Sequence, residues 1–469
     1  MSKKVMFNNH IVIVGFGAMG QGLLPLLFKH LEPKSSQITI VTDNENGKII
    51  ADKYNLDFKI HALNRTNYKQ VLRPLLNSGD MLLNMSVDVS SEDIIALCNG
   101  QESLYVDLST EPWKGGYNDV DTPPSERTNY ALRESCLERN KSIKHTAVIT
   151  HGANPGMASH FVKKALLNIA QDNNLKIEQP ATAQDWANLA NQLGIKAIHI
   201  AERDTQTTNR PYSPNEFVNT WSVDGFISEA FQPAELGWGS HERKLPKKGK
   251  QHEYGCKSAI YIEQPGASVK VRTWTPSFGA YHGFLITHAE SISISNYLTL
   301  QHDNEISYRP TVHYSYLPCP HAILSIQQLL SAEGVEPAKK RVLLDEITDG
   351  YDELGVLLMG NQKGAYWYGS TLGIEEARSL APHNSATSLQ VVASALVAIM
   401  WAIEHPDRGL IEPEDIDHQY ALDIASPYLG MVEGHYTNWT PLDNRGTLFE
   451  EDIDETDPWQ FSNIMVNNG

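Results

Sequence analysis

Residues 1–150 alternate short aliphatic runs, rich in β-branched residues, with longer stretches whose apolar positions fall at helical spacing. The short runs are typical of strands buried on both faces and lie at residues 11–14, 38–41, 81–86, 104–109 and 146–151. The stretches between them predict helices at residues 21–31, 68–77, 91–98 and 129–140. Strands and helices that alternate with short connections predict a parallel, doubly wound α/β sheet.

The pattern changes after this region. Residues 154–200 predict mainly helices, at 158–171 and 182–194. Polar and apolar residues then alternate in runs at 258–263, 268–274, 283–290 and 291–300, and a second set follows at 340–347, 351–360 and 364–372. Because alternation of period two is typical of strands, these runs predict a mixed or antiparallel sheet in a second, α+β domain.

We therefore expect a first domain at residues 1–153, completed by 385–440, a second at 154–384, and a C-terminal tail at 441–469. Beyond Tyr436 the chain is acidic and poor in aromatic residues apart from Trp439, Phe449, Trp459 and Phe461. We expect this tail to pack loosely or against a partner subunit. The basic, polar segment 238–255 predicts a solvated loop.

The apolar run at 391–403 is too short to span a bilayer, so it predicts a buried helix. The formal net charge of -18 argues against nucleic acid or an anionic membrane as a partner. The four cysteines, Cys98, Cys136, Cys256 and Cys319, are scattered without a metal or disulfide spacing. They indicate free thiols and a cytoplasmic protein.

A glycine motif lies where the first predicted strand meets the first helix. In "IVIVGFGAMGQG", Gly15 permits a tight turn, Gly17 lets the backbone approach a pyrophosphate, and Gly20 lets the helix pack on the strand. Ala18 and Met19 open the helix, whose free N–H groups favour phosphate. These features predict a Rossmann-type dinucleotide site.

Asp43 follows the second predicted strand, 23 residues beyond Gly20, near the spacing of the acid that bonds a ribose 2′-hydroxyl. No arginine follows it closely, so a 2′-phosphate would meet a carboxylate. The sequence therefore favours NAD over NADP.

Two further sets of polar residues follow predicted strands. They are Asn84, Ser86 and Asp88 in "LLNMSVD", and Ser109, Thr110 and Glu111 in "VDLSTEPW". Any one of them is most simply a cap. Because ligands of open α/β sheets lie beyond the carboxyl ends of the strands, the two sets together predict contacts on the nicotinamide side.

The stretch "NTWSVDGFISEAFQPAELGWG" brings Trp221 and Glu229 into one neighbourhood. Either Trp221 belongs to the core and Glu229 to the solvated surface, or the two side chains together hold a cation. His288 and Glu290 in "LITHAES" would share a face if this run is a strand, and a histidine there could exchange protons near neutral pH. No zinc spacing and no P-loop lysine are present, so no metal or ATP site is expected.

Several segments are more specific to one family than these general motifs. "HGANPGM" (151–157), with the glycine motif, is similar to the saccharopine dehydrogenase group of NAD(P) enzymes. The segments "HIAERDTQ", "NTWSVDGFISEA", "GFLITHAESISI" and "GYDELGVLLMG" resemble bacterial homospermidine synthases more closely, and the resemblance covers essentially the whole chain.

The resemblance implies an NAD-dependent transferase. One putrescine is oxidised, a second replaces ammonia, and the resulting imine is reduced again to homospermidine, while spermidine or related amines are alternative substrates. It also implies a homodimer, with the second domain serving substrate binding and dimerisation. Carried over by position, the substrate site falls on Trp221, Glu202, Glu229, His288, Glu290, Asp352 and Asn154, with Asp88 and Glu111 on the nicotinamide-side rim.

The residue types suit such a substrate. Putrescine has two ammonium groups and an apolar stem, so carboxylates with aromatic walls between them would bind it. The main alternative is a saccharopine- or carboxynorspermidine-type dehydrogenase, which would need clustered arginines for a keto acid. Arg203, Arg210, Arg243 and Arg272 are available for this role. A regulatory protein that holds the cofactor without turnover is a third alternative.

Overall fold

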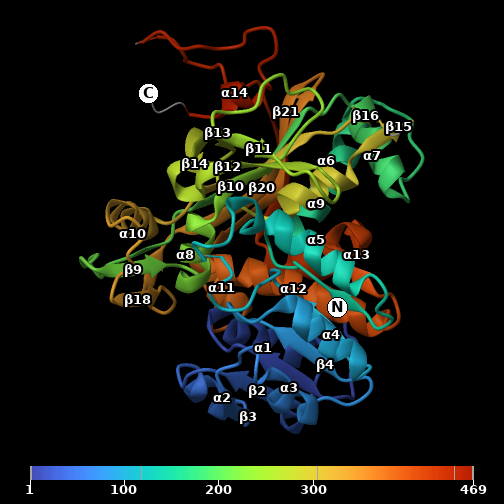
Figure 1. Cartoon of the computed structure of the whole chain (residues 1–469), viewed down its shortest axis with the longest axis vertical. Helices are drawn as coiled ribbons and strands as arrows, with labels where there is room; N and C mark the ends of the chain where they lie inside the picture. Colours follow the sequence, from blue (N-terminus) through green and yellow to red (C-terminus); the bar gives the residue numbers. More distant parts are fainter. Residues whose placement is uncertain (1–2, 118, 304, 448, 467–469) are drawn as a thin grey trace.

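The computed structural model of the chain describes residues 3–117, 119–303, 305–447 and 449–466. Two sheets lie one above the other along the longest axis, with the N-terminal domain at one end and the larger sheet toward the other (Figure 1). The helix α12 (Ala386–Glu404) lies between them and contacts strands of both sheets. The predicted fold class, a doubly wound α/β domain with a second mixed-sheet domain, is confirmed.

The first sheet has seven strands in the order β22-β6-β5-β4-β1-β2-β3, and all of its pairs are parallel. The strands are β1 (Ile11–Val14), β2 (Ile38–Thr42), β3 (Asp57–Ile60), β4 (Met81–Asn84), β5 (Leu104–Asp107), β6 (Ala147–Val148) and β22 (Leu410–Ile411). Five of them lie where the aliphatic runs predicted. The strand β3 was not predicted, because it is a partly exposed edge strand with a polar sequence. The strand β22 was not predicted, because Leu410 and Ile411 belong to no longer aliphatic run.

Helices connect these strands. They are α1 (Ala18–His30), α2 (Lys48–Lys53), α3 (Tyr68–Leu72), α4 (Ser91–Gly100) and α5 (Asn129–Asn140). Pro25 is accommodated inside α1. The predicted helix at 68–77 is wrong beyond Leu72, where a 3₁₀ turn containing Pro74 takes over. Proline lacks the N–H that an α-helix needs, so the helix ends there.

The second sheet has ten strands. Its main order is β11-β12-β10-β17-β7-β20-β21-β23, and the hairpin β13–β14 joins through β17. The strands are β7 (Ala197–Asp204), β10 (Pro233–Gly237), β11 (Gly249–Gln251), β12 (Ala259–Pro265), β13 (Lys270–Thr275), β14 (Gly279–Phe284), β17 (Thr311–Leu317), β20 (Tyr351–Asn361), β21 (Gly364–Gly373) and β23 (Met431–Thr437). The β17–β7 pair is parallel and the others are antiparallel, so the sheet is mixed, as predicted.

Register places polar residues of three central strands on one face of this sheet. Glu202 on β7 is paired with Tyr316 on β17 and with Leu354 on β20. Asp204 is paired with Asp352. Because side chains alternate between faces, Tyr314 also lies on this face. The sheet thus presents a row of buried acids and tyrosines on one side.

Smaller elements surround the two sheets. A side lobe, residues 216–231 and 320–342, projects from the larger domain and contains β9 (Glu216–Asn219), α8 (Val223–Phe231), α10 (Pro320–Ser331) and β18 (Lys339–Val342) (Figure 1). The remaining elements are α6 (Met157–Asp172), α7 (Ala183–Gln192), β8 (Thr207–Thr208), α9 (Ala289–Tyr297), β15 (Leu300–His302), β16 (Glu305–Tyr308), β19 (Ile347–Asp349), α11 (Ile374–Leu380), α13 (His418–Ala425) and α14 (Phe461–Ile464).

Three of the strand predictions need correction: the run 283–290 leaves its strand after Phe284, the run 291–300 is mostly helical, and the run 340–347 lies in another sheet. Residues 289–297 form the helix α9 instead of a strand. Its alternating serines and isoleucines mimic a strand, but the helix is buried almost all round, and Ser293 and Ser295 donate hydrogen bonds to Glu414 and to the Pro310 carbonyl. The run 340–347 does not continue the large sheet, because β18 pairs only with β9.

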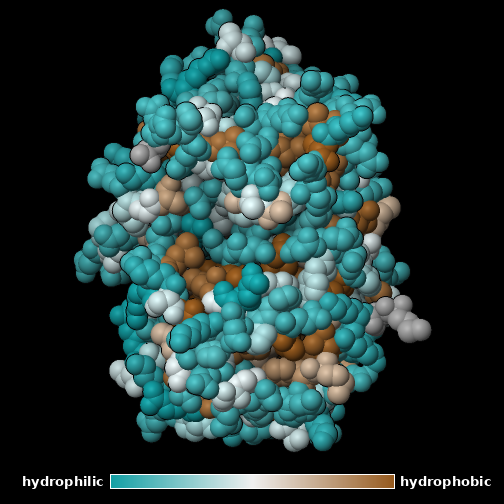
Figure 2. All heavy atoms as spheres, turned by 90° about the vertical axis from the view of Figure 1, so that its right-hand side faces the viewer, coloured by the Kyte–Doolittle hydropathy of each residue, from teal (hydrophilic) through white to brown (hydrophobic). Residues whose placement is uncertain are grey.

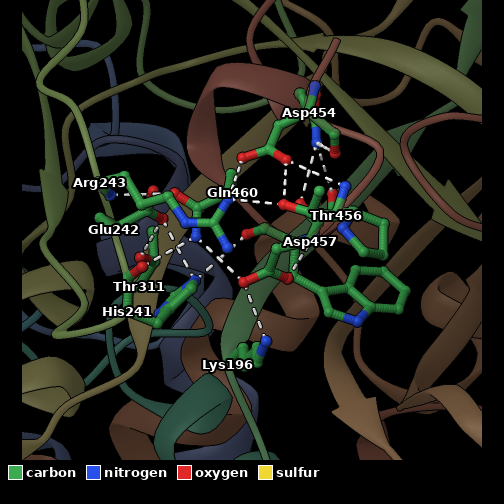
Figure 3. A network of polar contacts seen from close by, with 12 residues as sticks. Lys196, His241, Glu242, Arg243, Thr311, Asp454, Thr456, Asp457 and Gln460 are labelled. Atoms are coloured by element: carbon green, nitrogen blue, oxygen red, sulfur yellow. Dashed lines mark hydrogen bonds and ion pairs between the residues drawn. The ribbon is translucent and has the colours of Figure 1, made fainter.

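The expectation of a loosely packed tail is wrong as well. Trp459 and Phe461 are buried against the large sheet of their own chain, whereas Phe449 is exposed. The network of Figure 3 fastens the tail, with Asp457 2.9 Å from Lys196 and the Phe461 N–H donating to Glu242 at 2.9 Å. Trp459 and Phe461 therefore cover the face of the sheet opposite the acids.

The segment 238–255 is not simply a solvated loop. The carboxylate of Glu242 is buried and also accepts a hydrogen bond from Thr311 at 2.6 Å, while Arg243 pairs with Asp454 in the tail (Figure 3). Burial raises the pKa of Glu242 to about 7. This segment therefore serves as the docking surface of the tail.

The longest apolar helix lies inside the protein. By length and composition α12 is the one helix of the described residues that could cross a membrane, but 89% of its apolar window is buried. It packs on α1 and on both sheets, as a core helix does. On the face shown in Figure 2, hydrophobic residues gather in separate patches between wide hydrophilic areas.

Candidate active site

The glycine turn between β1 and α1 leaves open space at its centre. Gly15 has a φ of +84°, and a Cβ there would meet the backbone of Ser86 at 2.7 Å. A Cβ on Gly20 would come within 2.8 Å of the Gly15 carbonyl oxygen. At Gly17, by contrast, a Cβ would meet no atom within 4 Å. The turn is thus closed on the protein side and accessible where a ligand's phosphates would approach.

The start of α1 suits an anion. The helix begins at Ala18 and Met19, has no acidic residue in its first turn, and receives no side-chain hydrogen bond from its N-cap, Gly17. The N–H groups of a first helical turn lack partners within the helix and carry a partial positive charge. These residues therefore fit the pyrophosphate of a dinucleotide.

Asp43 directly follows β2 and is exposed. Its carboxylate accepts a hydrogen bond from the Asn44 side chain at 2.6 Å and has room for further donors. This is the strand end where a ribose hydroxyl is bound in Rossmann folds. The position of Asp43 is therefore compatible with the expected role.

Asn84 at the end of β4 is used inside the protein. Its amide donates to the Val89 carbonyl at 3.1 Å and to the Tyr105 hydroxyl at 3.3 Å, and its oxygen accepts from the Ser86 hydroxyl at 2.7 Å. Ser86 in turn packs against Gly15. The two side chains shape the turn, and only Ser86 stays partly exposed.

Glu111 organises the rim beyond β5. It accepts hydrogen bonds from the Ser109 hydroxyl at 2.7 Å and from the Asp88 N–H at 3.3 Å. Burial, aided by the charges of Glu229 and Asp88, raises the pKa of Glu111 to about 8. The buried hydroxyl of Thr110 has no hydrogen-bond partner among the described residues. The charge of Glu229 acts on Glu111, so the Rossmann rim and the second domain meet here.

His288 lies between two carboxylates. Its Nε2 is 3.2 Å from Oε2 of Glu229, and its Nδ1 is 3.3 Å from Oε1 of Glu290. Burial alone would lower its pKa, but Glu290 and Glu229 outweigh burial and raise the pKa to about 10. The imidazole is therefore protonated at neutral pH.

The expected proximity of His288 and Glu290 is found, but the predicted strand is not. His288 is the N-cap of α9 and Glu290 lies in its first turn. An acid in this position is favoured by the helix dipole. The second oxygen of Glu290 is buried and has no hydrogen-bond partner among the residues that the structure describes.

Glu202 is held by two donors. Its Oε2 accepts from the Asn154 amide at 2.6 Å and from the Tyr314 hydroxyl at 2.5 Å. Burial raises the pKa of Glu202 to about 7, and the nearby charge of Asp204 adds to this. Both donors lower it, but they do not offset burial.

Asp352 is completely buried next to these groups, and neither of its oxygens has a hydrogen-bond partner within the described part of the chain. Burial and the charges of Glu202 and Asp204 raise its pKa well above the ordinary value. A buried carboxylate without donors is costly unless a ligand pairs with it. Pairing with a cationic group of a ligand would offset this cost.

Asp204 was missed by the reasoning from sequence. It lies two residues after Glu202 on β7, and this spacing is the signal that could have found it. Unlike Asp352, it is fully bonded, to the N–H and side chain of Gln206 and to the hydroxyl of Thr220. Burial raises its pKa to about 6.

An aromatic wall completes the arrangement. The half-buried Trp221 donates from Nε1 to the Tyr316 hydroxyl at 3.1 Å and packs on Phe226. Tyr316 stacks on Tyr314, with ring centroids 5.3 Å apart, and Tyr314 stacks on His288 at 4.3 Å. The two tyrosines were also missed, although the alternation in "TVHYSYL" places them on one face of β17.

The structure therefore links the proposed substrate residues of the second domain through shared contacts and, for Asp352, through strand register beside Asp204. The members are Trp221, Glu229, His288, Glu290, Glu202, Asn154 and Asp352. Within the described ranges, no group of three or more potential ligands could hold a metal ion. The arrangement offers several acids, one protonated imidazole and an aromatic wall, which together suit a substrate with more than one positive charge.

A cavity of about 430 Å³ is lined by the rim residues Thr110 and Glu111 but by none of these seven substrate-site residues. The rest of its lining also comes from the first domain, including Tyr68, Asp93 and Arg139. The cavity is therefore not assigned to the substrate.

Family comparisons cover nearly the whole chain. Residues 11–150 match the family described as the saccharopine dehydrogenase NADP binding domain, and residues 152–437 match the saccharopine dehydrogenase C-terminal domain. The chain is 47% identical over 466 residues to a homospermidine synthase from Mesorhizobium japonicum, covering 97% of this chain and 96% of that protein. It is 48% identical over 465 residues to one from Blastochloris viridis, covering 98% and 97%.

A solved structure is also similar over its full length. The crystal structure of the homospermidine synthase from Legionella pneumophila in complex with NAD has a TM-score of 0.94 and 55% sequence identity, and the match covers 100% of both chains.

Proposed function

Because the chain belongs to the homospermidine synthase family, we propose that it joins two putrescine molecules to homospermidine and releases ammonia. The observation that carries the choice of substrate is the buried carboxylate of Asp352, which has no hydrogen-bond partner among the described residues. An ammonium group brings three donors and a positive charge, and so can pair with it. A diamine has two such groups on an apolar stem.

NAD is the cofactor. We place it against Gly15, Gly17, Ala18, Met19, Gly20 and Asp43, with Asn84, Ser86, Ser109, Thr110 and Glu111 along the rim. The open space at Gly17 and the uncapped start of α1 support this placement. When bound, NAD accepts a hydride from an amine-bearing carbon and returns it to an imine.

Asp352, Glu202 and Asn154 would hold the distant ammonium of the first putrescine. Glu202 keeps one donor from Asn154 and one from Tyr314, so its other oxygen can accept a bond from the substrate. Charge-assisted bonds to a buried ammonium are stronger than neutral ones. Holding this end would retain the fragment while its other end reacts.

His288 would act at the reacting end. The oxidised putrescine carries a C=N bond, and attack by the second amine forms a new C–N bond. The bond to the first nitrogen then breaks, and that nitrogen leaves as ammonia after it receives a proton. His288, protonated at neutral pH by virtue of Glu229 and Glu290, can supply that proton.

Trp221 would stabilise positive charge on the iminium carbon. A tryptophan face attracts a cation, and unlike a carboxylate it does not form a hydrogen bond that would trap it. Glu229, Glu290, Asp88 and Glu111 would guide the second diamine, because contacts and charge interactions link these acids between the Rossmann rim and His288. Spermidine and related amines have the same charged groups and are further candidate substrates.

The four arginines that a keto-acid substrate would need are engaged elsewhere. The Arg203 guanidinium lies 4.0 Å from the Phe278 ring, Arg243 pairs with Asp454, and Arg272 bonds the Met465 carbonyl. Arg210 lies beside Glu216 in the side lobe. A saccharopine- or carboxynorspermidine-type reaction is therefore less well supported.

One incubation separates the alternatives. The protein is mixed with putrescine and a trace of NAD, and products are followed by mass spectrometry. A new triamine with release of ammonia supports the proposal. Oxidation of NADH only when a keto acid is added would support the dehydrogenase, and tight NAD binding without product would support a regulatory protein.

We also propose how the chain is organised. Residues 1–153 with 385–440, apart from β23 (Met431–Thr437), which pairs in the large sheet, would hold the cofactor, 154–384 the substrate and the dimer contact, and 441–469 would be the tail. Homodimer formation rests on the family resemblance, and light scattering at micromolar concentration tests it, since a monomer would contradict it. Four cysteines that form no disulfide support a cytoplasmic location.

A further inference from the structure

Tyr314 joins the two halves of the candidate site. Its hydroxyl donates to Oε2 of Glu202 at 2.5 Å, and its ring lies against the imidazole of His288 with centroids 4.3 Å apart and planes 28° from parallel. Glu202 is on β7 and His288 precedes α9, so Tyr314 on β17 connects side chains of two separate elements. Tyr314 itself is only 2% exposed.

The hydroxyl of Tyr314 is fixed by its surroundings. The ring is stacked between His288 and Tyr316, and it projects from the middle of β17, which is paired on both sides in the sheet. A side chain packed on both faces has few alternative rotamers. The hydrogen bond to Glu202 is therefore pre-organised.

Glu202 depends on such donors because its neighbours oppose its charge. Asp204 lies on the same strand and Asp352 on the adjacent strand, and both carboxylates repel it. The titratable groups that face it from the other packed elements are His288, which attracts it, and the tyrosines Tyr314, Tyr316 and Tyr281, which are neutral. Among the described residues, Asn154 and Tyr314 are the donors that form hydrogen bonds with its carboxylate.

We propose that Tyr314 is a positioning residue, which holds the carboxylate of Glu202 and the imidazole plane of His288 at a fixed separation for the diamine. This rests on the proposed function, because it assigns the two groups to opposite ends of the reacting fragment. The fixed geometry matters because misplacement of reacting groups by about 1 Å costs roughly a hundredfold in rate.

The test compares two matched variants. Tyr314→Phe keeps the stacked ring and removes the hydroxyl, while Tyr316→Phe removes a hydroxyl from the same strand and the same stack. Tyr316 bonds Trp221 instead of a carboxylate. Both variants are first checked for NAD binding and thermal unfolding, and then kcat and KM for putrescine are measured across pH.

We expect Tyr314→Phe to lower kcat/KM by about ten- to a hundredfold, the range for a lost hydrogen bond to a charged group. Because a donor to the charged carboxylate is lost, the acidic limb of its pH profile moves up by about one unit. Tyr316→Phe should lower activity, because Trp221 loses its hydrogen-bond acceptor, but it should leave the acidic limb of the pH profile unchanged.

The double variant Tyr314→Phe with Glu202→Gln shows whether the hydroxyl acts through Glu202. The effect of Tyr314→Phe on kcat/KM should shrink to less than about threefold when residue 202 is glutamine. A Tyr314→Phe protein with an unchanged pH profile, or equal losses in both backgrounds, would overturn the inference. Absence of homospermidine with the unaltered protein would instead defeat the proposed function.

If Tyr314→Phe fails to fold, Asn154→Ala tests the same dependence from the other side of the carboxylate. It removes the second donor to Glu202 and should move the acidic limb in the same direction. An unmoved limb would contradict the dependence of Glu202 on its donors and with it the role of Tyr314.

Discussion

The Nε2 atom of His288 lies 3.2 Å from Oε2 of Glu229, although Glu229 belongs to α8 in the side lobe and His288 to the start of α9. This contact joins the lobe to the domain that carries the buried acids. Together with Glu290 it keeps the imidazole protonated. The pair therefore brings the side lobe against the acid-bearing domain and holds a protonated imidazole at their junction.

Replacing Glu229 by glutamine should lower the pKa of His288 from about 10. Burial lowers the pKa of His288, and with one attracting charge removed less opposes it, so we expect the pKa to fall by about one unit or more. Nuclear magnetic resonance of the labelled imidazole measures it, and the signal is assigned by its absence in His288→Gln. An unchanged titration would show that the contact does not govern the proton.

Trp221 should matter through its ring face. We expect kcat to fall in the order Trp, Phe, Ala, by a few fold for Trp221→Phe and by up to about thirtyfold for Trp221→Ala, which corresponds to about 2 kcal/mol for a desolvated cation–π contact. Affinity for NAD should stay the same, as fluorescence titration can establish. Loss of folding in both variants would favour a role in core packing.

Putrescine binding should weaken as pH falls through about 7. In the protein without diamine, burial raises the pKa of Glu202 to about 7 and that of Asp204 to about 6. An ammonium binds the carboxylate form of Glu202, and its positive charge also favours the ionised form of the nearby Asp204, so protons must be released before or during binding. The diamine stays doubly protonated over this range, and affinity should therefore rise from pH 6 to pH 8, at most about tenfold per unit for each proton released.

Calorimetry on the NADH complex measures this linkage without turnover. In buffers with different ionisation enthalpies, the observed heat should differ and report proton release. Glu202→Gln is the matched control, because it should reduce the proton release. Tighter binding at pH 6 than at pH 8 would contradict the assignment of these acids.

Asp43 should make the protein prefer NAD. Its exposed carboxylate can accept a hydrogen bond from a ribose hydroxyl and repels a 2′-phosphate. NAD should therefore bind at least about tenfold more tightly than NADP, a difference in binding free energy of about 1.4 kcal/mol. Asp43→Ser should reduce the ratio of the affinity for NAD to the affinity for NADP. Equal affinities for the unaltered protein would contradict this role of Asp43.

Much of the first domain could be predicted from local patterns. Strands that are buried on both faces leave uninterrupted aliphatic runs, as at Ile11–Val14, and the glycine turn has a sequence signature of its own. The edge strand Asp57–Ile60 has no such run, because solvent reaches it. The helix α9 was misread because burial on all sides removes the helical periodicity.

The candidate site could be predicted only in part. The resemblance pointed to His288 and Glu229, but residues far apart in the chain give no local signal that their side chains meet. Tyr314 was overlooked because a tyrosine on a buried strand is usually part of the core, and the sequence does not show that its hydroxyl donates to Glu202. The docking of the tail on Glu242 depends equally on contacts between distant segments.

The central claim is that the hydride removed from one putrescine returns to the joined product within the same enzyme complex. The most direct measurement uses putrescine deuterated at both amine-bearing carbons, catalytic NAD and an excess of unlabelled NADH in solution, with mass analysis of the triamine. Exclusion of water, and retention of the oxidised putrescine by Asp352 and Glu202, should allow the hydride to return before the cofactor dissociates. We predict homospermidine that retains all of its deuterium, without net NADH formation. A product one deuterium lighter, or one NADH released for each product, would contradict the account.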